Sequence, residues 1–94
     1  MTLLERDEID GRVREAEGWD LEGEAIVKQF KLGDFTGAVA FLDRIVPIAN
    51  EMNHHPDVSI SWETVTVMIT THSEGGLTSS DFDLAERIDA LGAG

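Results

Sequence analysis

The sequence predicts an α+β fold of order αββαββα, in which helices pack on one face of a four-stranded antiparallel sheet. Apolar residues recur at steps of three and four in three segments, and they alternate with polar residues in the segments between. The alternating segments come in consecutive pairs, which is typical of hairpins covered by helices. Because the chain has 94 residues and a second core would be too small to be stable, we expect residues 1–94 to form a single domain.

The first helix and the first hairpin are expected before residue 33. Residues 4–17 carry apolar side chains at helical spacing among charges, and the glycine that follows is typical of a helix end. Residues 19–21 and 25–32 predict two short strands, and the three residues 22–24 between them have the length of a hairpin turn.

A long amphipathic helix is expected from Phe35 to about Met52, where seven apolar residues share one face. Pro47 lies inside this segment, and an interior proline removes a backbone donor, so we expect a kink or a local compensation there. Pro56 disfavours a helical conformation for the residue before it. The helix should therefore give way to extended chain at His55.

Two alternating strands and a last helix follow. The alternation predicts strands at residues 58–62 and 64–72, with His72 on the face opposite the apolar one, so that it need not be buried. Residues 78–81, with sequence TSSD, resemble a capping box. The apolar stripe of the last helix then consists of Leu84, Ala85, Ile88 and Leu91.

Composition excludes several classes of protein. Nineteen acidic against seven basic residues give a net charge of −12, which disfavours binding to nucleic-acid phosphates. No cysteine is available for disulfides or thiolate metal sites, and no stretch approaches the roughly 20 apolar residues of a membrane helix. The first ten residues lack the basic start and apolar run of a secretory signal. We therefore expect a cytoplasmic protein that binds neither nucleic acid nor membrane.

The acidity and the small size suggest two further hypotheses. Lys28 and Lys31 are the only lysines beside nine Asp and ten Glu, which suggests adaptation to high salt, although ordinary solubility is the alternative. A sheet with one open face in so short a chain favours self-association.

The candidate chemistry rests on three histidines, His54, His55 and His72, all within a short part of the chain. If the helix end and the strand end meet at one edge of the sheet, His54 or His55 can face His72, with Asp57 and Asp81 beside them. An unperturbed imidazole has a pKa of roughly 6.5 and can both take and give a proton at neutral pH. Such a pair can eliminate water by acid–base catalysis without a metal.

Structural roles are the alternative for each of these residues. Histidines at a helix end such as His54 and His55 often only cap the helix or lie on the surface. Asp81 fits the third position of the last helix, where an acid stabilises the helix dipole. A three-histidine metal site is disfavoured because adjacent histidines point in different directions. Trp19 and Trp62 fit core or interface positions better than the wall of a flat ligand.

The motif that begins with Asn53-His54-His55-Pro56 resembles that of the pterin-4a-carbinolamine dehydratase family. It continues with Trp62, with Thr70-Thr71-His72, with Gly76-Leu77-Thr78 and with Asp81, and weaker likeness extends over nearly the whole chain. The resemblance implies the αββαββα fold and dehydration of 4a-hydroxytetrahydropterin to quinonoid dihydropterin, with no cofactor, in support of tetrahydropterin recycling. It also implies a homodimer or homotetramer.

The resemblance also implies roles for single residues. His54, His55 and His72 take the catalytic and pterin-binding positions, and the implied substrate contacts are Asn53, Thr70, Thr71, Ser73 and Asp81. The chain departs from the family at Asn50, where many members have Glu, and the neighbouring Glu51 is a candidate replacement. Because related folds act as assembly or dimerisation factors, a non-catalytic module that binds a protein partner is the alternative function.

Overall fold

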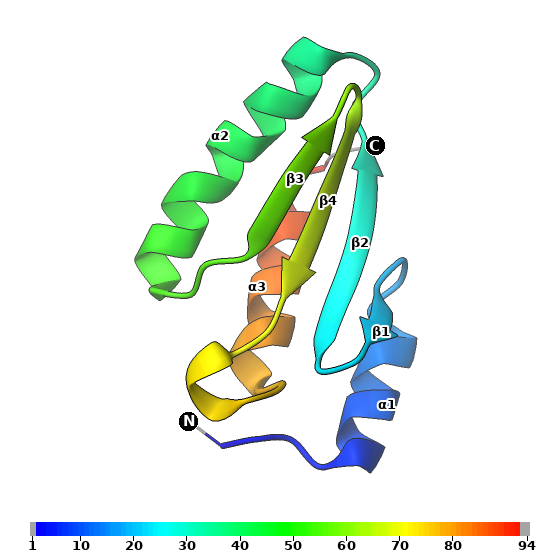
Figure 1. Cartoon of the computed structure of the whole chain (residues 1–94), viewed down its shortest axis with the longest axis vertical. Helices are drawn as coiled ribbons and strands as arrows, with labels where there is room; N and C mark the ends of the chain where they lie inside the picture. Colours follow the sequence, from blue (N-terminus) through cyan, green and yellow to red (C-terminus); the bar gives the residue numbers. More distant parts are fainter. Residues whose placement is uncertain (1, 93–94) are drawn as a thin grey trace.

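The computed structural model describes residues 2–92, and its elements follow the predicted order αββαββα (Figure 1). The elements are α1 (Arg6–Glu15), β1 (Asp20–Glu22), β2 (Ala25–Lys31), α2 (Phe35–Met52), β3 (Asp57–Ser61), β4 (Thr64–Ile69), the short 3₁₀ helix η1 (His72–Glu74) and α3 (Ser79–Asp89). The order of elements is therefore confirmed. The first helix begins two residues later and ends two residues earlier than residues 4–17.

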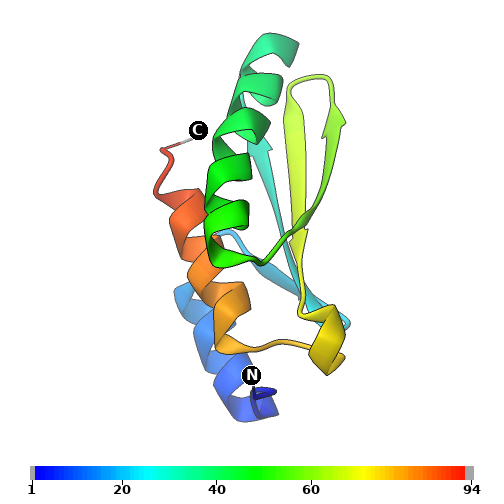
Figure 2. The ribbon, with the colours of Figure 1, turned by 90° about the vertical axis from the view of Figure 1, so that its left-hand side faces the viewer.

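The four strands form one antiparallel sheet in the order β1-β2-β4-β3, so β1 and β3 are its two edges. The three helices lie together on one face of the sheet, and the other face is open (Figure 2). This arrangement confirms the predicted layers. The buried apolar side chains between sheet and helices include Ile26, Phe30, Phe41, Ile45, Val65, Val67, Ile69, Leu84 and Ile88.

The long helix α2 runs through Pro47 and ends before the histidines. Its first turn is capped by Asp34, whose Oδ1 accepts a hydrogen bond from the Gly37 amide at 2.6 Å. It ends at Met52 because Asn53 adopts the left-handed conformation (φ 51°, ψ 43°), which asparagine tolerates better than most residues. The predicted bounds of this helix, Phe35 to about Met52, are therefore confirmed, and both His54 and His55 lie in the irregular segment between α2 and β3.

Two boundaries of the strands differ from the prediction. The first hairpin turn has two residues rather than three, because Glu22 pairs with Ala25. Strand β4 ends at Ile69 and does not continue to His72, since Thr71 pairs with Gly76 across a tight loop that contains η1. His72 is exposed, as expected, but it lies on η1 rather than on a strand.

Trp62 was expected to end a strand, but it lies in the turn between β3 and β4 and is exposed. Trp19, by contrast, is buried in the core, where its Nε1 donates to Asp89 at 3.0 Å. Helix α3 begins with the predicted capping box, in which Thr78 and Asp81 each bond the backbone of the other.

Candidate functional site

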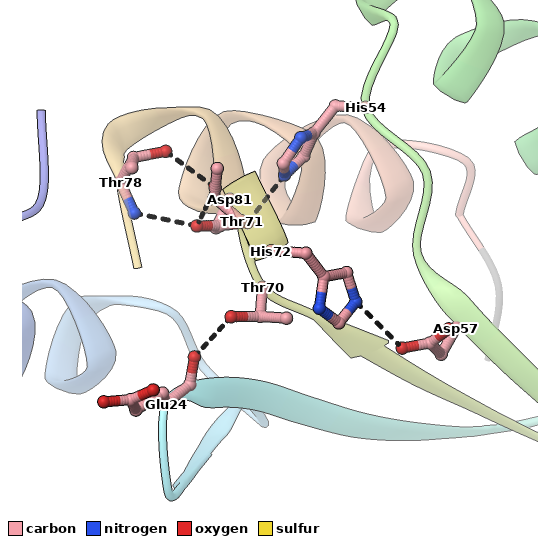
Figure 3. A network of polar contacts seen from close by, with 8 residues as sticks. All are labelled: Glu24, His54, Asp57, Thr70, Thr71, His72, Thr78 and Asp81. Atoms are coloured by element: carbon pink, nitrogen blue, oxygen red, sulfur yellow. Dashed lines mark hydrogen bonds and ion pairs between the residues drawn. The ribbon is translucent and has the colours of Figure 1, made fainter. Parts of the chain in front are cut away.

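Three elements meet at the end of the sheet where β4 stops. The extended chain after α2 carries His54, η1 carries His72, and the first turn of α3 carries Asp81. Figure 3 shows these side chains together with their polar contacts. These residues come from three segments that are separate in the sequence, and the fold brings them to one end of the sheet.

His54 is held by a buried carboxylate. Its Nε2 lies 2.6 Å from Oδ1 of Asp81, and its side chain is only 12% exposed. Because a carboxylate oxygen accepts hydrogen bonds, Nε2 carries the hydrogen and the other ring nitrogen, Nδ1, is left for other contacts. His54 is therefore more than a surface or capping residue, since its orientation and its tautomer are both determined by Asp81.

Asp81 is fully buried, and its second oxygen is also used. Oδ2 accepts hydrogen bonds from the hydroxyl of Thr71 and from the backbone amide of Thr78, each at 2.8 Å (Figure 3). The Thr71 and Thr78 hydroxyl oxygens lie 3.0 Å apart. A carboxylate with several buried donors is rigidly held. Asp81 thus both caps α3, as predicted, and holds His54.

His72 is exposed, as His55 is. Its side chain is 79% exposed, and its Nε2 lies 3.8 Å from Oδ2 of Asp57, which is also exposed. At this distance and exposure the contact restricts the ring only weakly. His72 can therefore move to meet a ligand, whereas His54 cannot.

His55 is oriented by a neutral side chain. Its Nε2 lies 2.9 Å from Oδ1 of Asn50, one helical turn back on α2, and because an amide oxygen only accepts, Nε2 donates. Many family members have an acid at the position of Asn50, and Glu51 was the candidate to replace it. Glu51 instead forms an ion pair with Arg87 of α3 at 3.1 Å. The ring is thus held by an amide and not by a carboxylate.

The remaining expected substrate contacts lie around the same end of the sheet. Asn53 and Ser73 are exposed, and Thr71 is buried in the Asp81 network. The hydroxyl of Thr70 donates to the backbone carbonyl of Glu24 at 2.6 Å, which ties the end of β4 to the first hairpin. Thr70 and Thr71 are therefore held by protein partners, while Asn53 and Ser73 are open to a ligand.

Sequence reasoning missed the part that Thr78 plays in this site. The sequence placed Thr78 in the family motif and in the helix cap but not among the site residues. The signal that could have found it is that Asp81 belongs both to the cap and to the motif. The backbone carbonyl of Glu24, which accepts the hydrogen bond from Thr70, could not be predicted from the sequence, because every residue has a backbone carbonyl.

Hollows elsewhere on the surface do not contain the histidines. One of about 640 Å³ lies between α1 and α3, and a smaller one of about 240 Å³ lies between the N-terminal segment, the first hairpin and the loop before α3. Within residues 2–92 no three His, Cys, Asp or Glu side chains are grouped as ligands of a metal ion. Over the same residues, no helix has the length and apolar character needed to span a membrane.

Comparison with known proteins gives one consistent family. The profile of the family described as Pterin 4 alpha carbinolamine dehydratase matches residues 2–91. Proteins from Sulfurisphaera tokodaii (46% identical, covering 97% of this chain and 98% of that protein) and Sulfolobus acidocaldarius (43%, covering 94% and 97%) are both named, provisionally, as pterin-4-alpha-carbinolamine dehydratases.

Solved structures agree with this assignment. A transcriptional coactivator/pterin dehydratase from Brucella melitensis superposes with a TM-score of 0.90 at 33% identity, covering 96% of this chain and 98% of that one. A pterin dehydratase-like protein identified as a RuBisCO assembly factor in the alpha-carboxysome superposes with a TM-score of 0.68 at 24% identity, covering 80% and 89%, and it shows the fold alone. By profile, by sequence and by fold, the chain belongs to the pterin-4a-carbinolamine dehydratase family.

Proposed function

We propose that this protein is a lyase that dehydrates 4a-hydroxytetrahydropterin to quinonoid dihydropterin and so supports tetrahydropterin recycling. The observation that carries the proposal is the pairing of His54 with the buried Asp81 at the end of the sheet that also presents His72. A fixed imidazole beside a mobile one is suited to a reaction in which one proton is removed and another is delivered. The membership of the family gives the substrate class.

The reaction needs two proton transfers. A base removes the proton on N5 of the pterin, the N5 lone pair forms the new double bond to C4a, and an acid protonates the hydroxyl on C4a, which leaves as water. His54, His55 and His72 supply the candidate groups. Since Asp81 takes Nε2–H of His54 and Asn50 takes Nε2–H of His55, Nδ1 is the reacting nitrogen of both rings.

The substrate contacts follow from exposure. Asn53 and Ser73 are next to the histidines in the chain and are exposed, which supports a role for both in bonding the polar edge of the pterin. Thr70 and Thr71 act mainly through the loop that they hold, and Asp81 acts through His54, because its carboxylate is inaccessible.

The proposal is tested kinetically. The purified protein should accelerate the loss of chemically generated 4a-hydroxytetrahydropterin, and His72→Ala should lose most of that rate, because acid–base catalysis typically contributes about 10² to 10⁴-fold. His72 is exposed, so its removal should leave stability nearly unchanged. An unchanged rate in this variant contradicts the role of His72, and no acceleration by the parent protein contradicts the function.

Self-association through α2 is also part of the proposal. Phe35, Val39 and Val46 are exposed and apolar, and with Leu42 they follow the 4-3-4 spacing of a helix-pairing seam. We assign this seam to a second copy of the chain, which gives a homodimer or, with a further interface, a homotetramer. Val39→Glu with Val46→Glu should lower the mass that light scattering measures in solution, and an unchanged mass contradicts the seam.

The same exposed seam favours one alternative, a non-catalytic assembly or dimerisation module that binds a protein partner. The three histidines are present, which argues against it. A stoichiometric protein partner recovered together with no dehydratase activity would support this alternative and overturn the enzyme.

A further inference from the structure

The N-terminal segment, residues 2–5, contacts the loop that carries η1. It passes beside this loop before the chain enters α1 (Figure 1). The backbone amide of Leu4 donates a hydrogen bond to the backbone carbonyl of Leu77 at 2.9 Å. Leu3 lies against Gly76, and a Cβ atom added to that glycine would be only 3.1 Å from Cδ2 of Leu3. We call residues 2–5 the N-terminal strap.

The two contacts fall on a part of the family motif that still lacks a role. Of Gly76-Leu77-Thr78, only Thr78 takes part in the Asp81 network. Gly76 is buried, and its φ lies outside the left-handed region, so backbone freedom does not explain a glycine there. The space that its missing side chain leaves is instead the place where Leu3 lies. The strap therefore accounts for the glycine of the motif.

Gly76 connects the strap to the supports of two histidines. Gly76 and Thr71 exchange backbone hydrogen bonds of 3.1 and 3.3 Å, which close the loop at the residue before His72. The hydroxyl of Thr71 also donates to Asp81, whose other oxygen holds His54. A displacement of Gly76 is thus transmitted to His72 through the main chain and to His54 through the carboxylate.

The strap can move without disrupting the core. It crosses the smaller hollow of about 240 Å³, with Leu3 and Leu4 on one side and Leu21 and Leu77 on the other. Leu3 is 47% exposed, and helix α1, which follows the strap, has no buried residue. Segments with few buried contacts open at a low free-energy cost. The position of the strap is therefore sensitive to its contacts with the loop.

We propose that Leu3 and Leu4 are positioning residues of the candidate site. By holding Gly76 and Leu77, the strap fixes the base of the η1 loop, and so the place from which His72 reaches a ligand. The identity of the ligand, a pterin, rests on the proposed function, whereas the coupling of strap and loop does not. Because coupling between two sites is reciprocal, a ligand that needs the ordered loop must in turn tighten the strap.

Hydrogen exchange measured by NMR tests the coupling without any assay of activity. The amides of Leu4 and Thr71 donate the hydrogen bonds of the strap and of the loop base, so both should exchange slowly in the parent protein. Leu3→Ala removes the packing on Gly76 and should speed exchange at both amides by about fivefold, the scale of a half-exposed leucine side chain.

Val13→Ala is the matched control. Val13 lies on the helix that follows the strap, packs against the core and does not line the hollow under the strap. This variant should lower the melting temperature and leave the exchange of Leu4 and Thr71 unchanged. Exchange that stays the same in L3A, or that rises equally in V13A, overturns the coupling.

A double-mutant cycle tests the contact between Leu3 and Gly76. Gly76→Ala places a methyl group in the space that Leu3 occupies, so kcat/KM should fall by about tenfold. In the Leu3→Ala background the space is free, and the same substitution should cost less than about twofold. No loss in G76A, or an equal loss in both backgrounds, contradicts the positioning role. If G76A does not fold, L3A, which only removes atoms, still decides it.

The response to a ligand is a readout that a purely structural role would not change. Saturating 7,8-dihydropterin, a stable tautomer of the proposed product, should slow exchange of the Leu4 amide in the parent protein. L3A should bind it about fivefold more weakly, the factor by which the strap has loosened, and V13A should bind it as the parent does. Unchanged exchange of Leu4 in the saturated protein overturns the link between strap and site.

The outcomes separate the two proposals. If the parent neither binds 7,8-dihydropterin nor accelerates the dehydration, the proposed function fails, and exchange without ligand still decides whether the strap holds the loop. If the parent is active but L3A exchanges and reacts as the parent does, the positioning role of the strap is wrong and the dehydratase stands.

Discussion

Replacement of Asp81 by asparagine should separate the catalytic from the structural role of the buried carboxylate. Asn has the same shape as Asp, but one of its two terminal atoms donates hydrogen bonds. If the NH₂ group faced Thr71 and Thr78, two donors would lose their acceptor, whereas an NH₂ group that faces His54 only reverses the direction of one hydrogen bond. The NH₂ group should therefore turn toward His54.

The consequence for His54 is a change of tautomer. Its Nε2 must then accept a hydrogen bond, so the hydrogen moves to Nδ1, the nitrogen assigned to the reaction. The hydrogen bonds of residue 81 are then no longer charge-assisted, which destabilises the fold by about 1 kcal/mol and, for a domain of this size, lowers Tm by about 6 °C. If His54 is the base, Nδ1 then carries a hydrogen and cannot remove the N5 proton, so kcat should fall by at least about 100-fold.

Asp89→Asn is the matched control. Asp89 lies in the same helix, and its carboxylate accepts from the Trp19 indole at 3.0 Å and from Lys28 at 2.8 Å, away from the histidines. This variant should also melt at a lower temperature but should keep its dehydratase rate. Thermal melts by circular dichroism and initial rates with 4a-hydroxytetrahydropterin measure both effects. If D81N keeps its rate within about twofold, or if both variants lose rate equally, the assignment of His54 is refuted.

Three further predictions concern the rest of the fold. Lys28→Met removes the half-buried ion pair with Asp89 and should lower the free energy of unfolding by about 1 kcal/mol in urea titrations, an effect that vanishes in the Asp89→Asn background. Gly37→Ala should destabilise by about 1–3 kcal/mol, although alanine normally favours helices, because its Cβ would lie 2.7 Å from the backbone oxygen of Leu32; an increase in urea midpoint contradicts this. Tm should rise between low and molar KCl if self-repulsion of the −12 charge limits stability, and a flat response contradicts adaptation to salt.

The hydrophobic pattern of the sequence predicted the presence and type of each helix and strand better than the residues at which they begin and end. Helical periodicity located α2, because a buried face extends along its whole length, and the capping box located the start of α3. The end of β4 was misplaced because polar residues after Ile69 continue the alternation. What stops the strand is the pairing of Thr71 with Gly76, a contact that periodicity does not encode.

The sequence names the candidate site residues, but it does not show the contacts between them. The motif named His54 and Asp81, yet they are 27 residues apart, and only the fold shows that one oxygen of the carboxylate holds the ring. For His55 the sequence suggested the loss of a contact that the structure retains in another form. The expected acid at the position of Asn50 is missing, and only the geometry shows that the amide takes over the orientation of the ring.

Because Asp81 both caps α3 and holds His54, the position of the His54 ring depends on the stability of α3. A carboxylate that caps a helix is positioned by the whole first turn of that helix. The hydrogen bond from His54 to Asp81 therefore holds the imidazole ring at a fixed place relative to α3. His72, on a short loop, has no such support. In the proposed reaction one imidazole is thus fixed before the substrate arrives, and the other is ordered by the substrate.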